Sequence, residues 1–243
     1  MVKEAIDQAF ILGAGLGKRM HPLTETCPKP LVKLAGKPLI DHVIKRLSSV
    51  GVEKIVVNVH YLADQLEAHL NQVSNPVIIP SSERSELLDT GGGAAKALEY
   101  FGDKPFFIHN SDSVWLEGDE DNLARMIAEF DRVKMDALLL LADRTGSLGY
   151  NGKGDFKISK DGRLIRRQAD ETADCVFAGV SIAHPRLFEA HPKGPFSLNL
   201  LWDRAMQEGR IYGIKHHGIW MHVGTSEALD DAEHCIKQST LTL

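Results

Sequence analysis

The chain has 243 residues, of which 43% are apolar and 25% charged, and its formal net charge is −5. This composition is ordinary for a soluble globular protein, and no segment is long or polar enough to be called low-complexity. A net negative charge argues against the broad basic surface that nucleic acids require, so we expect no nucleic-acid partner. The residues before Gly13 lack the layout of a secretory signal, and the apolar run 137–142 is too short to cross a bilayer, so we expect a cytoplasmic protein without membrane contact.

The first predicted element is a short apolar strand over residues 9–12, which leads directly into a glycine-rich loop. The loop reads Gly13-Ala14-Gly15-Leu16-Gly17, followed by Lys18 and Arg19. Glycines let the backbone turn tightly, so that amide N–H groups can face an anion. Within residues 18–37 five Lys and Arg side chains stand against Glu25 alone. Such a local basic segment on an acidic chain favours a small polyanion such as a nucleoside triphosphate.

The spacing of this loop matches neither of two common phosphate-binding motifs. The Walker motif needs four residues between its first Gly and Gly-Lys-Ser/Thr, but only three separate Gly13 from Gly17, and Arg19 follows Lys18. The dinucleotide motif needs a Gly or Ala where Lys18 stands. Another kind of phosphate site is therefore indicated.

Helical and strand patterns alternate along the next part of the chain. We expect helices over residues 39–50, 63–70, 93–100 and 122–134, and strands over 55–59, 77–79, 106–108 and 137–141. This alternation predicts an α/β fold with a mostly parallel sheet covered on both faces and ligands at the carboxyl ends of the strands.

The pattern changes after residue 148. Residues 155–159 and 163–167 flank Asp161-Gly162 and predict an antiparallel hairpin. We expect further strands over 176–182, 211–214 and 219–223, and helices over 198–208 and 226–237. The prediction is a single domain over 1–243, with two halves of about 1–145 and 146–243 that share one sheet.

A candidate metal ligand follows the strand at 106–108. The chain continues there as His109-Asn110-Ser111-Asp112, which places a carboxylate where a strand ends. Mg²⁺ prefers carboxylate oxygen, uses one or two protein ligands and bridges to phosphate oxygens. The alternative is that Asp112 only forms a turn or caps a helix.

The sequence G-x-G-x-G-K-R-M-x-P-L-T, followed by C-P-K-P-L-V and then by N-S-D, resembles the sugar-1-phosphate nucleotidylyltransferases, also called nucleotide-sugar pyrophosphorylases. The resemblance implies a Rossmann-like three-layer sandwich with a mostly parallel mixed central sheet and a small antiparallel sugar-side region. It makes about 1–145 the nucleotide-binding half and about 146–243 the sugar-binding half. It assigns the β- and γ-phosphates of the nucleotide to Arg19 and the loop, the α-phosphate to Lys29 and Mg²⁺ to Asp112. Further nucleotide contacts are expected from the loop residues Leu12, Gly13, Ala14, Gly15, Gly17 and Lys18.

Two further segments extend the resemblance to the base and the sugar. Leu88-Asp89-Thr90-Gly91-Gly92-Gly93 resembles the base-binding segment of enzymes that uridylylate N-acetylmuramic acid 1-phosphate, so Thr90, Gly91 and Gly92 are expected to contact the nucleotide. The alternative is a helix cap followed by a glycine turn. Sugar contacts are expected from Asn110, Gly154, Asp155 and Gly179, although the last three also fit a hairpin turn and a closely packed strand.

The chain departs from the family pattern at two places. His222 stands where the family commonly has Asp as a second Mg²⁺ ligand, and imidazole suits transition metals better. We therefore expect Mg²⁺ to be held mainly by Asp112, with His222 as a second candidate ligand and Mn²⁺ as a substitute ion. The family's E-K-P lysine is also missing, and Arg166 or Arg167 either replaces it or is a solvated strand charge.

The resemblance implies the reaction NTP + sugar 1-phosphate → NDP-sugar + pyrophosphate, with UTP and N-acetylmuramic acid 1-phosphate as the expected pair. A mannose 1-phosphate guanylyltransferase is the first alternative, followed by thymidylyl and phosphocholine-cytidylyl relatives. Two other classes stay open, a nucleotide-sugar-binding regulatory protein without catalysis and a metal-dependent glycosyltransferase. We expect a monomer or a small homo-oligomer.

Overall fold

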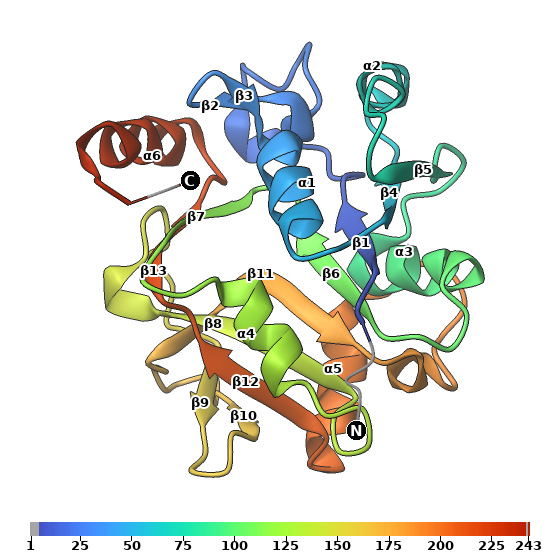
Figure 1. Ribbon diagram of the computed structural model, residues 1–243, viewed down its shortest axis with the longest axis vertical. Coiled ribbons are helices and arrows are strands. Elements are labelled where there is room, and N and C mark those ends of the chain that lie inside the picture. The colour runs from blue at the N-terminus through green and yellow to red at the C-terminus, as the bar shows by residue number, and fades with distance from the viewer. Residues whose placement is uncertain (1–4, 242) are drawn as a thin grey trace.

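The protein is described by a computed structural model, and the description below concerns residues 5–241 and 243. A nine-stranded sheet runs through the centre of the molecule in the order β10-β9-β11-β6-β1-β4-β5, with β8 beside β11 and β12 beside β8 (Figure 1). Its strands are β1 (Gln8–Leu12), β4 (Lys54–Val59), β5 (Val77–Ser82), β6 (Phe106–Asn110), β8 (Ala137–Asp143), β9 (Phe156–Ile158), β10 (Leu164–Arg166), β11 (Cys175–Ala183) and β12 (Ile211–Lys215).

The sheet is mixed, and its parallel part carries the N-terminal strands. β1 lies between β6 and β4 and is parallel to both, while β11 is antiparallel to β6 and to β8. In the register of β1 and β6, Leu12 lies opposite Asn110. Because parallel strands end at the same edge of a sheet, the loop after β1 emerges beside the segment that leads to Asp112.

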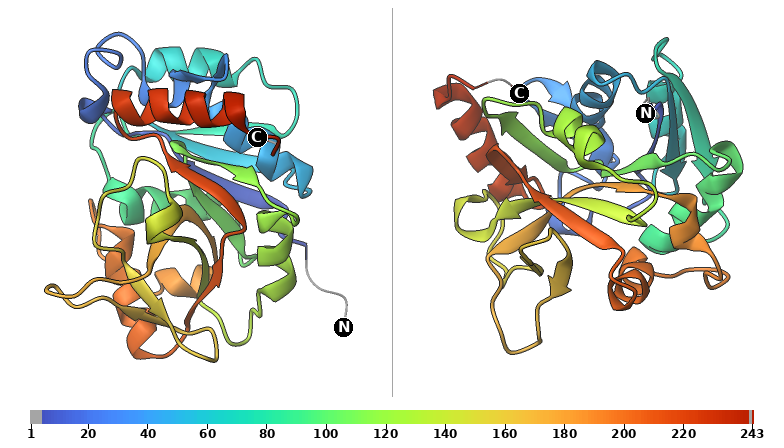
Figure 2. Two further views of the ribbon diagram at one scale, coloured as in Figure 1. Left: turned by 90° about the vertical axis from the view of Figure 1, so that its left-hand side faces the viewer. Right: turned by 60° about the horizontal axis from the view of Figure 1, so that its bottom comes forward.

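Helices cover both faces of this sheet, which gives three layers (Figure 2). α1 (Leu39–Ser49), α2 (Ala63–Leu70) and α4 (Asn122–Glu129) share one apolar core, and α3 (Asp89–Ala97) and α5 (Leu198–Gln207) share the other. Alternation along β1 feeds both cores, since Ala9 and Ile11 face the first and Phe10 faces the second. The expected α/β three-layer fold is confirmed. No helix in the described ranges combines the length and apolar character that a membrane span requires.

Two small antiparallel sheets complete the fold. β2 (Lys33–Leu34) pairs with β3 (Lys37–Pro38), and β7 (Ser113–Glu117) pairs with β13 (Gly218–His222). α6 (Ser226–Gln238) packs against β2 and β13 in a third apolar cluster. The pairing of β7 with β13 brings the end of the chain back to the residues that follow β6.

Two expected helices have other bounds in the structure, and one strand was not expected. α3 begins at Asp89 rather than at residue 93, because Gly91 and Gly92 are buried inside the helix. α4 ends at Glu129 rather than at residue 134, since the Asp131 carboxylate accepts hydrogen bonds from the Val133 and Lys134 amides and holds a turn there. β7 was not expected, because the five residues after Asp112 show no clear strand pattern. Its partner strand β13 lies about a hundred residues further along the chain.

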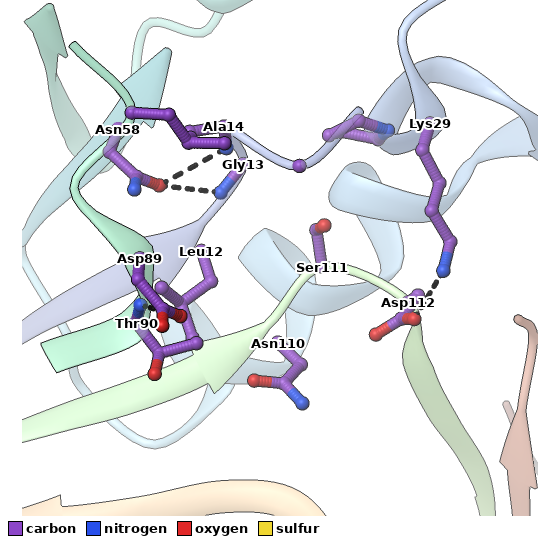
Figure 3. A pocket seen from close by; sticks show the side chains of 13 residues that line it. Leu12, Gly13, Ala14, Lys29, Asn58, Asp89, Thr90, Asn110, Ser111 and Asp112 are labelled. Atoms are coloured by element: carbon purple, nitrogen blue, oxygen red, sulfur yellow. Dashed lines mark hydrogen bonds and ion pairs between the residues drawn. The ribbon is translucent and has the colours of Figure 1, made fainter. Parts of the chain in front are cut away.

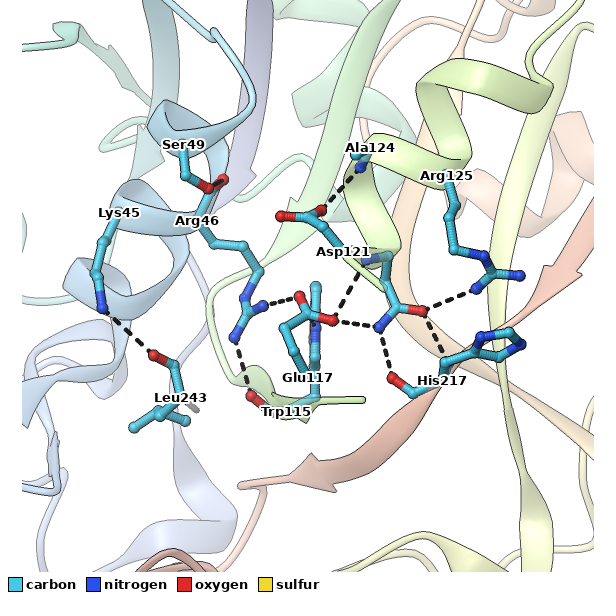
Figure 4. Close-up of polar contacts among 11 residues, drawn as sticks. Lys45, Arg46, Ser49, Trp115, Glu117, Asp121, Ala124, Arg125, His217 and Leu243 are labelled. Atoms are coloured by element: carbon cyan, nitrogen blue, oxygen red, sulfur yellow. Dashed lines mark hydrogen bonds and ion pairs between the residues drawn. The ribbon is translucent and has the colours of Figure 1, made fainter. Parts of the chain in front are cut away.

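A buried polar network connects α1, β7 and α4 (Figure 4). The Glu117 carboxylate forms a short ion pair with Arg46, and it accepts hydrogen bonds from Trp115 Nε1 at 2.7 Å and from Asn122 Nδ2 at 2.5 Å. The Arg46 guanidinium lies 4.2 Å from the centre of the Trp115 ring. Asn122 also exchanges hydrogen bonds with the backbone of His217, so the network reaches the turn before β13.

We expect the Glu117→Ala substitution to lower the free energy of unfolding by about 3–5 kcal/mol, because it leaves the Arg46 charge buried without its partner. Urea denaturation of both proteins measures this loss. The control is Glu120→Ala, which removes an exposed carboxylate from ion pairs with Arg125 and His217 and is expected to cost less than about 1 kcal/mol. Equal losses in the two variants would contradict the assignment.

Candidate active site

A cavity of about 510 Å³ opens at the carboxyl ends of β1, β4 and β6 (Figure 3), a size typical of small-molecule sites. The glycine loop forms one wall, the start of α3 a second wall, and the segment after β6 the floor. The residues that line it are Leu12, Gly13, Ala14, Gly15, Lys29, Pro30, Asn58, Leu87, Asp89, Thr90, Asn110, Ser111 and Asp112.

A second cavity of about 390 Å³ shares Gly15 and Lys29 with the first and is therefore its neighbour. It is also lined by Leu16, Gly17, Lys18, Arg19 and Gly224. Within residues 5–241 and 243, neither Lys18 nor Arg19 forms an ion pair with an acidic side chain. Their charges are free to bind an anion that extends from the larger cavity.

Lys29 and Asp112 form an ion pair at the junction of the two cavities. Lys29 begins a 3₁₀ turn (Lys29–Leu31) after Pro28, and its ammonium group contacts Asp112 Oδ2 at short range. Each side chain is only 13% exposed. Burial raises the pKa of Asp112, but attraction to Lys29 and to His222 outweighs it, so the pKa lies below its ordinary value. Asp112 is therefore ionised at neutral pH.

His222 lies beside the same carboxylate. The β7–β13 pairing and a hydrogen bond from the Val223 amide to the Asp112 carbonyl oxygen, at 3.1 Å, hold the two segments together. His222 Nδ1 is 3.9 Å from Asp112 Oδ2, and its ring stacks on Trp220. Burial lowers the pKa of His222, and the charges of Lys29 and Arg19 lower it further against the pull of Asp112. The imidazole is therefore neutral at pH 7.

The donor set at Asp112 fits a hydrated Mg²⁺ ion that shares the phosphates of a substrate. Lys29 contacts one carboxylate oxygen, and the aspartate is ionised, as a metal ligand must be. No group of three or more His, Cys, Asp or Glu side chains suited to a metal occurs in the described part of the chain. A cation here would depend on water and substrate oxygens for the rest of its shell, which is usual for Mg²⁺.

The glycine loop differs in detail from the sequence expectation. The amides of Gly13 and Ala14 donate to Asn58 Oδ1 at 2.7 and 3.3 Å and are engaged within the protein. Both residues line the cavity, and their expected contact with the nucleotide stays a prediction. The amides of Gly15 and Gly17 donate to no acceptor among the described residues and are free for a phosphate. Sequence reasoning missed Asn58, although an uncharged polar residue inside an apolar strand is a visible signal.

Two glycines of the TGGG segment, residues 90–93, have a packing role. The amides of Gly91 and Gly92 donate to the Phe196 carbonyl oxygen, and a Cβ atom at position 91 would lie 2.4 Å from the Phe196 ring. These two glycines allow α3 to pack closely against the segment before α5, and their expected contact with the nucleotide stays a prediction. Thr90 lines the cavity, and its hydroxyl accepts a hydrogen bond from the Leu198 amide at 2.9 Å.

One of the four expected sugar-binding residues lines the larger cavity, and a second lies beside it. Asn110 lines the larger cavity, and Gly179, in a β-bulge of β11 with φ of +81°, is close enough that a Cβ atom would lie 3.4 Å from Asn110 Cβ. Gly154, Asp155 and Gly179 line neither of these cavities. The Asp155 carboxylate accepts a hydrogen bond from the Phe177 amide at 2.9 Å.

Arg166 and Arg167 are both engaged within the protein. Arg166 forms an ion pair with Asp203 and donates a hydrogen bond to Asn199. The Arg167 guanidinium donates to the carbonyl oxygens of Gly154, Gln168, Ala169 and Glu171, which fixes the loop after β10. Neither guanidinium is therefore free for a sugar phosphate in this structure.

A glycine loop, free cations and an ionised aspartate at the carboxyl edge of an open α/β sheet define a nucleotide-binding protein of the phosphate-transfer type. The sequence model described as "Nucleotidyl transferase" matches residues 8–150. The chain belongs to the nucleotidyl transferase family, as its resemblance predicts, and it is a nucleotidyltransferase.

Individual proteins give a closer comparison. An N-acetylmuramate alpha-1-phosphate uridylyltransferase of Caulobacter vibrioides is 45% identical over 229 residues, which cover 93% of this chain and 95% of the relative. The protein of the same name from Neisseria meningitidis serogroup B is 35% identical over 229 residues, covering 93% and 96%. A structure of UDP-glucose pyrophosphorylase complexed with UDP-glucose matches with a TM-score of 0.78 over 96% of this chain and 99% of that chain, and at 16% identity it shows a shared fold.

We expect the Lys29→Met substitution to raise the pKa of Asp112, because burial then acts without the opposing charge. A carboxyl-carbon NMR titration measures this pKa. In the wild type the lowered pKa stabilises the fold above the ordinary Asp pKa, and this contribution is lost as the pH falls through the folded value. Lys18→Met is the control, since Lys18 does not contact Asp112. An Asp112 pKa that is the same in the wild type and in Lys29→Met would contradict the ion pair.

Proposed function

We propose that this protein transfers the uridylyl group of UTP to N-acetylmuramic acid 1-phosphate and releases pyrophosphate. The observation that supports nucleotidyl transfer is that the glycine loop, Lys29 and Asp112 line the same cavity. The choice of substrates is supported by the two relatives of that name, which match nearly the whole chain.

The reaction is an in-line displacement at phosphorus. An oxygen of the sugar 1-phosphate attacks the α-phosphorus of UTP, and the bond between that phosphorus and the bridging oxygen of the β-phosphate breaks. The new bond forms the nucleotide sugar, and the electron pair of the broken bond leaves on pyrophosphate. No protein residue becomes covalently attached, so the protein acts by positioning two anions and by neutralising their charge.

The residues divide this work by their positions. Lys29 lies at the junction of the cavities and contacts the α-phosphate, where the two anionic substrates meet. Arg19 and the free amides of Gly15 and Gly17 line the smaller cavity and hold the β- and γ-phosphates as pyrophosphate forms. Lys18 adds positive charge at the rim of the smaller cavity.

The nucleoside and the sugar phosphate take the remaining contacts. Thr90 and Leu12 contact the nucleoside, and Asn110 and Gly179 contact the sugar phosphate. Sugar contacts from Gly154 and Asp155 stay a prediction.

Asp112 would hold Mg²⁺, with His222 as a second ligand and Mn²⁺ as an alternative ion. The bound ion supplies positive charge to the phosphate oxygens at the attack centre. Asp112 itself contributes an ionised oxygen at neutral pH, and His222 contributes a neutral ring nitrogen close to it.

We further propose a division of labour along the chain, with nucleotide binding in about 1–145 and sugar binding in about 146–243. We also propose that the enzyme is cytoplasmic and acts as a monomer or small homo-oligomer.

A screen of four nucleoside triphosphates against a panel of sugar 1-phosphates, read by pyrophosphate release, tests the function. We expect the highest kcat/KM for UTP with N-acetylmuramic acid 1-phosphate. Preference for GTP with mannose 1-phosphate would favour the guanylyltransferase alternative, and absence of pyrophosphate with every pair would refute nucleotidyl transfer.

A second experiment tests the metal ligands. The screen is repeated with Mg²⁺, Mn²⁺ and Co²⁺ for the wild type and for His222→Ala. An unchanged metal preference in that variant would exclude His222 as a ligand.

We expect Arg19→Ala and Asp112→Ala each to lower kcat by at least about a hundredfold, the scale for loss of a preorganised charge contact. Steady-state kinetics with saturating substrates measures this loss. Matched controls are Lys237→Ala on α6, whose side chain is 74% exposed, and Asp64→Ala on α2, whose side chain is 96% exposed. The controls are expected to keep their rates. Near wild-type rates in either site variant would refute its assigned role.

A further inference from the structure

Glu83 is a buried acid that the proposed chemistry does not use. It follows β5, its residue is 1% exposed, and its carboxylate forms no ion pair in the described part of the chain. Oε1 instead accepts a hydrogen bond from Asn58 Nδ2 at 2.7 Å, and Oε2 accepts one from the Leu88 amide at 2.9 Å. A buried carboxylate with two directed donors has a fixed orientation.

Asn58 carries this contact forward to the glycine loop. Its side-chain oxygen accepts the amides of Gly13 and Ala14, and Figure 3 shows both bonds. An amide side chain can point its oxygen or its NH₂ group toward the loop, and only the first choice suits two backbone donors. The Glu83 carboxylate selects that choice, because it needs the NH₂ group on its own side.

The second oxygen of Glu83 reaches the opposite wall of the cavity. Leu88 precedes Asp89, whose φ of +60° starts α3, and both Asp89 and Thr90 line the cavity. The space around this contact is closed, because a Cβ atom at Gly93 would lie 2.7 Å from Glu83 Oε1 and 2.8 Å from Asn58 Nδ2. The two walls are therefore joined by one chain of hydrogen bonds that runs from the glycine loop through Asn58 and Glu83 to Leu88.

We propose that Glu83 and Asn58 are positioning residues, which fix the phosphate-binding loop and the nucleoside-binding start of α3 at the separation that a nucleoside triphosphate requires. This inference deepens the proposed function and rests on it. Glu83 acts through Asn58 and Leu88 rather than by touching the nucleotide. The expected signature is a loss of nucleotide affinity that leaves the use of the sugar phosphate unchanged.

A reversal of hydrogen-bond polarity provides a direct test of this chain. Glu83→Gln alone sets its new NH₂ group against the NH₂ group of Asn58 or removes the acceptor for Leu88. Asn58→Asp alone sets two carboxylates face to face. The double variant restores every bond, since the new carboxylate at position 58 accepts from Gly13 and Ala14. The new amide at position 83 then donates to that carboxylate and accepts from Leu88.

The measurements are the Kd for UTP by calorimetry and the KM values for both substrates, with thermal unfolding as a check on folding. We expect each single variant to weaken UTP binding about tenfold or more, the scale of one misdirected buried hydrogen bond, with the KM for the sugar phosphate within about twofold of wild type. The double variant is expected to bind UTP within about threefold of wild type.

The inference would be overturned if the losses of UTP affinity in the two single variants simply added in the double variant. Unchanged UTP binding in the folded single variants would overturn it too. If a single variant fails to fold, the double variant decides alone. A folded double variant with near wild-type affinity supports the chain, and one that is unfolded or does not bind refutes it. Failure of the proposed function is distinguishable, because in that case the wild-type protein itself binds no UTP or releases no pyrophosphate.

Discussion

The ion pair between Lys29 and Asp112 joins two segments that are 83 positions apart in the chain, and the rest of the site is arranged around it. Lys29 belongs to the turn after the glycine loop, and Asp112 follows β6. The parallel pairing of β1 with β6 brings both segments to one edge of the sheet. Because each partner is largely buried, neither charge is stable there alone, and the pair sets the position of the cavity floor relative to the loop.

The distribution of charge around this pair suits a reaction between two anions. The protein as a whole is acidic, yet Lys18, Arg19 and Lys29 gather along one continuous hollow. The Asp112 carboxylate is already paired with the Lys29 ammonium group, and the nearby His222 is neutral at pH 7. The hollow therefore attracts polyphosphate without placing an uncompensated negative charge where the two substrates meet.

Much of this arrangement could be predicted from sequence, because the relevant signals are local. One predicted strand is followed by the loop 13–19 and another by Asp112. Both patterns indicate ligand contacts at the carboxyl ends of parallel strands, independently of the rest of the sequence. The alternation of strands and helices likewise predicts the three layers. Boundaries at regular apolar spacing, such as those of α1 and α2, agree with the expectation to within one or two residues.

The rest depends on contacts between distant segments, which no local pattern encodes. From the sequence alone, Gly91 and Gly92 indicate a base contact or a glycine turn. Their place inside α3 is explained by the packing of Phe196 against them. Asn58 and Glu83 look like isolated polar residues, and only the adjacency of β1, β4 and β5 shows that they connect two walls of one cavity. β7 could not be predicted from local sequence either, because its partner strand β13 lies near the C-terminal end of the sequence.

The most direct test of the account is a crystal structure of the protein with Mg²⁺ and a non-hydrolysable UTP analogue. We expect one continuous ligand density, with the terminal phosphates at Arg19 and the free loop amides, the α-phosphate at Lys29 and the cation on Asp112. A nucleotide bound away from the glycine loop, or a triphosphate that lies beyond reach of Asp112, would contradict the central claim that these groups serve one ligand.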